Sequence, residues 1–182
     1  MKILHTADWH LGQTFYEYDR REEHLHFLEW LKQQIKQHEI DVLLIAGDVF
    51  DSPNPSAESQ RVYYRFLREV TSENPSLQIV IIAGNHDSAA RLEAPNPLLE
   101  DMNIIVRGTV RRNAEGDIDL QHFIVPLYTE GKVTAYCLAV PYLRQGDYPS
   151  AENYSKGVQQ LYEQLFNKVK EKGIPVVAMG HL

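Results

Sequence analysis

Short apolar runs in this chain end on residues that can bind a metal. Three of the four runs lead into a glycine followed at once by a polar side chain, and the first leads into an Asp-Trp-His string. In chain order they are Ile3–Ala7 before Asp8 and His10, Val42–Ala46 before Gly47 and Asp48, Ile79–Ala83 before Gly84, Asn85, His86 and Asp87, and Val176–Met179 before Gly180 and His181. Such runs are typical of buried parallel strands, and open α/β sheets bind ligands at the carboxyl ends of their strands. We therefore expect these polar side chains to converge.

Length and composition indicate an ordinary globular protein. The chain has 182 residues, which suits one domain with a sizeable core. Its single cysteine, Cys137, excludes an internal disulfide framework and fits a reducing compartment. We find no signal peptide and no apolar run near the ~18 residues that a membrane span needs. We expect a cytoplasmic protein with no membrane association.

The formal net charge is −7, which does not by itself indicate a nucleic-acid partner. Most proteins that bind phosphate backbones have a basic surface. Carboxylates gathered to hold metals make part of the acidity local, and two divalent cations would reverse its sign there. The small basic clusters, such as Arg20-Arg21 and Arg111-Arg112, read as solvated helix or turn faces.

The order of the predicted elements indicates an α/β sandwich. Helices are expected from about 19, from Ser56 to about Thr71, around Arg91–Asp101, and over a last stretch that ends near Gly173. They alternate with the apolar strands, which is typical of parallel sheets. Between Asn103 and Val140, Val and Ile runs broken by turn residues predict hairpin strands that form a second sheet or extend the first.

The polar residues at the strand ends suit a pair of metal ions that hydrolyses a phosphate diester. Two metals ~3.5–4 Å apart lower the pKa of a bound water and clamp the phosphate. Asp8 and His10 can reach one metal, Asp48 stands where a bridging carboxylate is needed, and the second metal would take Asn85 and His181. Oxygen and imidazole ligands suit manganese, iron or zinc.

The neighbours of these ligands suggest acid–base roles. His86 directly follows Asn85, and we expect it to donate a proton to the leaving oxygen or to contact the transition state as a cation. Asp51 could accept a hydrogen bond from His86, fixing its tautomer and raising its pKa. For Asp87 we expect a cap on the following helix.

Together these motifs resemble the calcineurin-like metallophosphoesterases. The matching strings are Asp8-Trp9-His10, Gly47-Asp48-Val49-Phe50-Asp51, Gly84-Asn85-His86-Asp87 and Gly180-His181. The longer strings Ile3–Gly12 and Ala46–Asp51 are similar to the nuclease subunits of bacterial double-strand-break repair complexes. The resemblance implies a two-sheet β-sandwich flanked by helices, two manganese ions, a homodimer built on the helices after the second and third motifs, and an ABC-type ATPase partner. The implied activity is a 3′-to-5′ exonuclease on duplex DNA and an endonuclease at hairpins or blocked ends.

The resemblance also implies roles for single residues. Asp48 would bridge the two metals, the side chains of Asp8, His10, Asn85 and His181 would bind them, and His86 would aid catalysis. The family continues with a Gly-His-X-His motif that gives each metal one more histidine, whereas this chain stops at Leu182. We therefore expect residues 1–182 to be the N-terminal part of a truncated nuclease domain, which binds manganese weakly and has little nuclease activity.

Two other functions stay open on these residues. A metallophosphatase acting on a phosphoprotein or a small phosphodiester would need the same metal site. A non-catalytic module that dimerises and binds a partner would use the aromatic face Tyr63–Leu67, which could equally be helix core. Gln13, Tyr16 and Tyr18 lie beside the first motif and either contact a substrate strand or pack in the loop.

Overall fold

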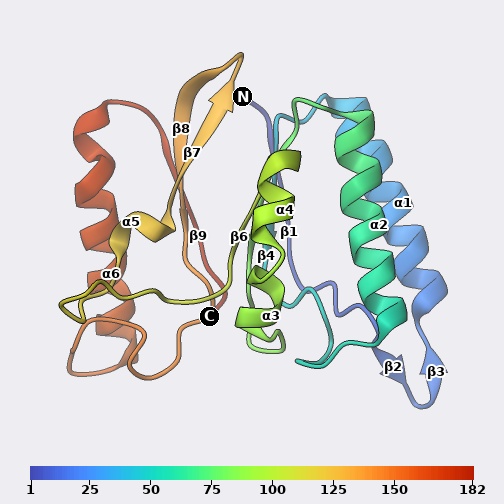
Figure 1. The fold of residues 1–182 in the computed structure, drawn as a ribbon, viewed down its shortest axis with the longest axis horizontal. Coiled ribbons are helices and arrows are strands. Elements are labelled where there is room, and N and C mark those ends of the chain that lie inside the picture. Colours follow the sequence, from blue (N-terminus) through green and yellow to red (C-terminus); the bar gives the residue numbers. More distant parts are fainter.

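A computed structural model describes all residues, 1–182, and shows two sheets packed face to face between layers of helices (Figure 1). The first sheet has the order β1-β4-β5-β6, and all of its strands are parallel. The second has the order β7-β8-β9, with β7 antiparallel and β9 parallel to β8. The predicted α/β sandwich of two sheets flanked by helices is confirmed.

The two central strands of the first sheet are buried on both faces, which explains why their sequences are almost continuously apolar. The sheet consists of β1 (Ile3–Thr6), β4 (Val42–Ala46), β5 (Gln78–Ile82) and β6 (Ile104–Arg107). Leu43 and Ile45 of β4 point into the core under the helices, whereas Val42 and Leu44 point into the core between the sheets. Because the apolar side chains of β4 and β5 meet a core on both faces, these strands show no alternation of polar and apolar residues.

Two long helices cover the outer face of the first sheet. They are α1 (Arg21–His38) and α2 (Ala57–Glu73), which lie side by side in Figure 1. The Ser56 hydroxyl caps α2 by accepting a hydrogen bond from the Ser59 amide at 3.0 Å, as the sequence predicts. The aromatic face of α2 belongs to the core, because Tyr63 and Phe66 are buried. The sequence reason for expecting dimerisation through these side chains is therefore lost.

The second sheet packs against the last helix. It contains β7 (Ile124–Thr129), β8 (Lys132–Ala139) and β9 (Val176–Met179), and α6 (Tyr154–Val169) covers its outer face. The apolar stripe of α6, from Val158 to Val169, is buried there. Gln78 joins the two sheets: its amide donates to the Pro126 carbonyl at 3.0 Å and accepts from the Tyr128 amide at 3.2 Å.

The middle of the chain differs from expectation in detail. The helix expected around Arg91–Asp101 is broken into α3 (Ala89–Glu93), α4 (Asn96–Leu99) and the 3₁₀ turn η1 (Glu100–Met102), because Pro95 and Pro97 interrupt it. Of the strands between Asn103 and Val140, β6 extends the first sheet and β7–β8 form the hairpin of the second.

Three small elements complete the structure. A short hairpin, β2 (Thr14–Phe15) and β3 (Tyr18–Asp19), projects below α1 in Figure 1, and the Tyr16 side chain at its tip is 90% exposed. Helix α5 (Leu120–Phe123) precedes β7, and the 3₁₀ turn η2 (Lys170–Lys172) follows α6. None of the helices is both long enough and apolar enough to cross a membrane.

Candidate metal centre

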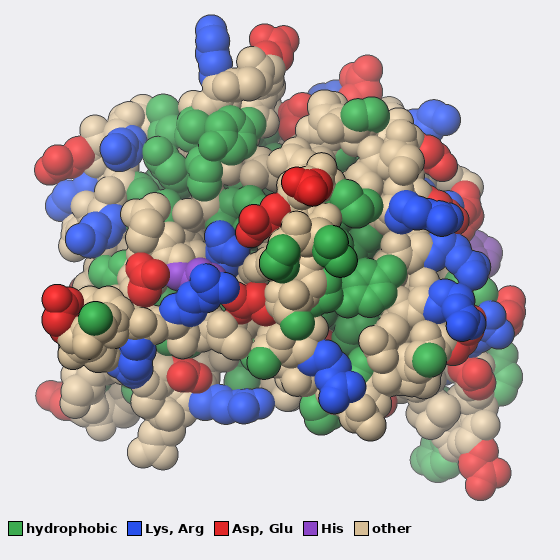
Figure 2. All heavy atoms as spheres, viewed as in Figure 1, with side chains coloured by type: hydrophobic (Ala, Val, Ile, Leu, Met, Phe, Trp, Pro, Cys, Tyr) green, Lys and Arg blue, Asp and Glu red, His purple; other side chains and the backbone are tan.

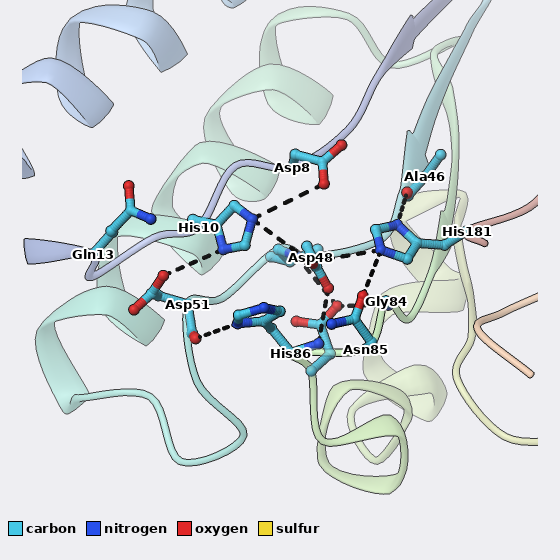
Figure 3. A network of polar contacts seen from close by, with 12 residues as sticks. Asp8, His10, Gln13, Ala46, Asp48, Asp51, Gly84, Asn85, His86 and His181 are labelled. Carbon is cyan, nitrogen blue, oxygen red and sulfur yellow. Dashed lines mark hydrogen bonds and ion pairs between the residues drawn. The ribbon is translucent and has the colours of Figure 1, made fainter. Parts of the chain in front are cut away.

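Loops from both sheets bring the predicted ligands together (Figure 3). Asp8 and His10 follow β1, Asp48 follows β4, and Asn85 with His86 follows β5. His181 arrives from the second sheet, two residues after β9 ends at Met179. The convergence predicted from strand ends is therefore found, but it joins the edges of two sheets, not one. Metal binding by these residues remains a prediction.

The Asp48 carboxylate lies at the centre of this group. Its Oδ2 atom is 3.5 Å from His10 Nε2 and 3.6 Å from His181 Nε2, so one oxygen faces both imidazoles. Its Oδ1 atom accepts a hydrogen bond from the His86 amide at 2.9 Å. Asp48 is also buried, with 3% of its surface exposed. A buried carboxylate between two ligand sets has the position that a bridging ligand requires.

The contacts of His181 leave one of its nitrogens free for a cation. Its Nδ1 atom lies 2.9 Å from the Ala46 carbonyl, which can only accept, so Nδ1 carries the proton. In the neutral ring, Nε2 then presents a lone pair toward Asn85 Oδ1, 3.0 Å away. Nε2 and Oδ1 are then two acceptors with no hydrogen between them. A cation bound by both atoms would satisfy both lone pairs.

His10 has a similar arrangement on the other side of Asp48. Its Nε2 atom is 3.9 Å from Asp8 Oδ1, and its Nδ1 atom is 3.3 Å from Asp51 Oδ1. Nδ1 is buried and has no well-aligned hydrogen bond. Ligand atoms of Asp8, Asp48 and His181 all lie within 4.8 Å of one another. This set of oxygen and imidazole donors fits divalent cations.

The backbone at the centre adopts a left-handed conformation at three of the predicted ligands. Asp8, His10 and Asp48 have φ angles of 56°, 46° and 48°, in the left-handed region that non-glycine residues seldom occupy. Gly84 approaches so closely that a Cβ atom there would lie 2.1 Å from Asp48 Oδ1. The loops are therefore packed tightly around the side chains that they present.

Two roles expected from the sequence differ in the structure. His86 Nδ1 is bonded at 2.9 Å to the backbone carbonyl of Asp51, not to its carboxylate, which faces His10. Asp87 does not cap α3, whose N-cap is Ser88. Its buried carboxylate instead accepts hydrogen bonds from three amides, those of Val49, Phe50 and Gly84.

A backbone hydrogen bond and nearby carboxylates make His86 easier to protonate than a free imidazole. The hydrogen bond to the Asp51 carbonyl raises the pKa of His86, and the charges of Asp48 and Asp51 add to this rise, against a smaller opposing effect of desolvation. Burial raises the pKa of Asp87, opposed by its three amide bonds. An exposed imidazole that holds its proton more firmly than usual can serve as an acid or as a cation beside the metals.

Sequence reasoning misses the residues that support the centre. The Ala46 carbonyl that orients His181 is a backbone group, which carries no signal in the sequence. Tyr142 belongs to none of the motifs, although its ring centroid lies 6.3 Å from that of His181. Asp87 is expected only as a cap, because two of its amide partners, Val49 and Phe50, lie 38 and 37 residues earlier in the chain and are found only through the fold.

Known proteins with similar sequences include named nucleases. The calcineurin-like phosphoesterase family matches residues 1–182. The SbcD subunit of the nuclease SbcCD from Rhodobacter capsulatus is 42% identical over 194 residues, which cover 100% of this chain and 48% of the relative. The Escherichia coli K12 protein of the same name is 31% identical over 196 residues, covering 100% of this chain and 46% of the relative. The solved structure of Pseudomonas putida nuclease MPE aligns with 57% of this chain and 46% of that chain, at 21% identity and a TM-score of 0.37.

The fold is of the phosphoesterase type, and the donor set at its strand ends is a candidate site for divalent metals. The chain belongs to the calcineurin-like phosphoesterase family. It spans about half the length of the curated relatives that it matches.

Proposed function

We propose that this chain forms the metal-binding part of a DNA nuclease of the SbcD type, which cleaves phosphodiester bonds with two divalent metals in DNA repair and recombination. The proposed activities are 3′-to-5′ exonuclease action on duplex DNA and endonuclease action at hairpins or blocked ends. The proposal includes manganese as the metal, a homodimer, an SbcC-type ABC ATPase as partner, and a cytoplasmic location.

The observation that carries the proposal is the position of the Asp48 carboxylate between two sets of ligands. His10 lies on one side, Asn85 and His181 lie on the other, and Asp8 is close to both imidazoles. When bound there, two divalent cations supply Lewis-acid polarisation of the phosphate and a water of lowered pKa. The protein holds the ligands in place, through the Ala46 carbonyl on His181 and the Asp87 bonds on the two loops.

His86 is the residue of this chain best placed to handle a proton. Its ring is exposed, lies with its centroid 4.9 Å from that of His10, and keeps its Nδ1 proton on the Asp51 carbonyl. Nε2 of the imidazolium can then donate to the oxygen that leaves the phosphorus, which is general-acid catalysis. The raised pKa of His86 keeps that proton available closer to neutral pH.

The choice of DNA as substrate rests on the relatives, whose names call them nucleases. The charge of the surface does not by itself indicate DNA as the substrate. The net charge is −7, and Figure 2 shows Lys and Arg side chains interspersed with Asp and Glu on the viewed face. Affinity for DNA would then come from the metals and from single basic groups near them, and not from a broad basic surface.

A comparison of substrates tests the proposal. The complete gene product, supplied with manganese, is assayed on blunt duplex DNA, on hairpin DNA and on bis(p-nitrophenyl) phosphate, with Asp48→Asn as the inactive control. We expect cleavage of both DNAs that depends on manganese and is lost in Asp48→Asn. Hydrolysis of the small ester alone would identify a metallophosphatase. Activity that survives in Asp48→Asn or in excess chelator would contradict the metal centre.

A further inference from the structure

The segment that follows β8 lies directly against the metal centre. The Val140 amide donates to the Met179 carbonyl at 3.2 Å, and the Tyr142 amide donates to the Ala83 carbonyl at 2.8 Å. Ala83 immediately precedes Gly84 and Asn85, and Met179 lies two residues before His181. This segment is therefore fixed to the same two loop ends that carry Asn85 and His181.

A hollow of about 230 Å³ opens where this segment meets the loop after β5. Its lining includes Gly84 from the centre, Thr109 from the segment after β6, and Tyr142, Arg144 and Asp147. Gly84 is in van der Waals reach of the Asp48 carboxylate, since a Cβ atom on Gly84 would overlap Oδ1. The hollow therefore adjoins the Asn85 and His181 half of the centre.

Tyr142 lines the hollow, and its ring packs against that of His181. Its ring stands nearly perpendicular to that of His181, at an interplanar angle of 76°. The backbone of Tyr142 is anchored, but its hydroxyl makes no hydrogen bond within the chain, and the residue is only partly buried. The hydroxyl is free to donate to a ligand.

Arg144 presents an unpaired cation to the same hollow. Its guanidinium takes part in no ion pair, unlike the basic side chains of Arg20, Arg21 and Arg111. The carboxylate nearest to it along the chain is already engaged, because Asp147 Oδ2 accepts the Arg144 backbone amide at 2.8 Å. The Asp147 amide donates back to the Arg144 carbonyl at 3.0 Å, which closes a tight turn and holds the arginine at the rim.

We propose that Tyr142 and Arg144 bind the phosphate next to the scissile one in a polynucleotide strand. The inference rests on the proposed function, since it assigns the substrate of that same centre. A strand that places one phosphate on the metals carries its next phosphate beyond them, and the hollow lies beside the Asn85–His181 half. A guanidinium binds a phosphate through two parallel hydrogen bonds, and a phenol adds a third donor.

This arrangement would distinguish polynucleotide substrates from small phosphodiesters. Bis(p-nitrophenyl) phosphate has one phosphate and cannot occupy the hollow with a second, whereas DNA can. Arg144 therefore contributes to binding of DNA and not to hydrolysis at the metals. Loss of its guanidinium should raise KM for DNA and leave kcat on the small ester unchanged.

The test uses Arg144→Gln and Tyr142→Phe in the complete gene product. For Arg144→Gln we expect about a tenfold rise in KM for duplex DNA, the size of one charge-assisted contact. Binding of a fluorescein-labelled duplex, followed by anisotropy at several salt concentrations without cleavage, should weaken by a similar factor. Its salt slope should fall by about 1, as for the loss of one phosphate contact. Tyr142→Phe should weaken binding severalfold and keep the slope, because it removes no charge.

Lys168→Gln is the matched control. Lys168 is an exposed cation near the C-terminal end of α6, at the end of the molecule away from the centre (Figure 1). The Lys168→Gln variant should leave KM and the salt slope at their parent values.

Unchanged DNA binding in Arg144→Gln, or an equal loss of activity on DNA and on the small ester, would overturn the inference. The protein could also bind DNA through Arg144 and yet cleave no DNA. That result would overturn the proposed nuclease function but would still support the phosphate site.

Discussion

Asp51 holds His86 through its backbone carbonyl, 2.9 Å from Nδ1, while its own carboxylate faces His10 at 3.3 Å. A carbonyl oxygen can only accept, so the bond keeps a proton on Nδ1 of His86 whatever side chain stands at position 51. One residue thus positions two imidazoles through two different groups. The carboxylate belongs to the predicted ligand His10, and the backbone belongs to the predicted acid His86.

Replacing Asp51 by Asn should separate these two effects. The variant removes the charge beside His10 Nδ1 but keeps the backbone bond to His86. Loss of a carboxylate that supports a metal-ligating histidine costs about 10–100-fold in metal affinity or activity. We expect manganese affinity, measured by isothermal titration calorimetry, to fall within that range. One limb of the pH–kcat/KM profile should report the titration of His86. Its apparent pKa should stay above that of a free imidazole, because the hydrogen bond to the Asp51 backbone carbonyl, the main cause of the raised pKa, remains.

His86→Gln is the companion variant. It should remove that limb and leave manganese affinity close to the parent value. If Asp51→Asn moves the limb to lower pH and leaves metal binding unchanged, the Asp51 carboxylate acts on His86 after all.

Two glycines with similar backbones test how closely the centre is packed. Gly47 and Gly131 have φ angles of 88° and 75°, so alanine is strained by about 1–2 kcal/mol at either position. A Cβ atom at Gly47 would lie 2.4 Å from His181 Nδ1, whereas nothing lies within 4 Å at Gly131. Gly47→Ala should therefore lower the free energy of unfolding by more than Gly131→Ala and abolish metal binding. Urea unfolding and manganese titration measure both, and equal losses in the two variants would contradict the close approach.

Asp87→Asn tests the carboxylate that joins two loops. Asp87 is 1% exposed and accepts amides from Val49, Phe50 and Gly84. Asparagine has one acceptor oxygen, and its NH₂ group would face an amide donor, so at least one buried donor is left unpaired. We expect a loss of about 1–3 kcal/mol in the free energy of unfolding and weaker manganese binding. Thermal unfolding with and without manganese measures both, with Asp101→Asn in η1 as a control that changes neither.

The sequence predicts the layers and the convergence because both follow from local patterns. Runs such as Val42–Ala46 are apolar at every position, which only a strand buried on both faces requires. The glycines at their ends allow the positive φ of Gly47 and the close approach of Gly84. Because Asp48 lies at the carboxyl end of a parallel strand, its proximity to the polar side chains at the other strand ends can be predicted.

Contacts set by the packing of distant segments cannot be predicted in this way. The pairing of Asp87 with a loop 38 residues earlier depends on the register of β4 against β5. The aromatic side chains of α2 are partly covered by Trp9, whose ring centroid lies 5.3 Å from that of Phe66.

His122 makes the stability of the fold depend on pH at a place away from the metal centre. Its ring is buried, and Nε2 has no hydrogen bond, although it lies 3.7 Å from Glu93 Oε1. Desolvation, together with the charges of Arg107 and Arg111, lowers the pKa of His122 to about 4. The unfolded chain binds the proton near pH 6.5, so between these values it holds more protons than the folded chain. The free energy of unfolding therefore falls as the pH drops through this window, by ~3 kcal/mol.

His122→Phe should remove this share of the pH dependence, because phenylalanine fills a similar space and does not titrate. The variant should retain part of the slope, since burial also lowers the pKa of His24 and acts in the same direction. The measurement is urea unfolding at several pH values from 7 down to about 4.5, a window set by the two pKa values of His122. His26→Phe, at an exposed position on α1, should keep the parent slope. A slope in His122→Phe equal to that of the parent would show that the proton taken up on unfolding belongs to other groups.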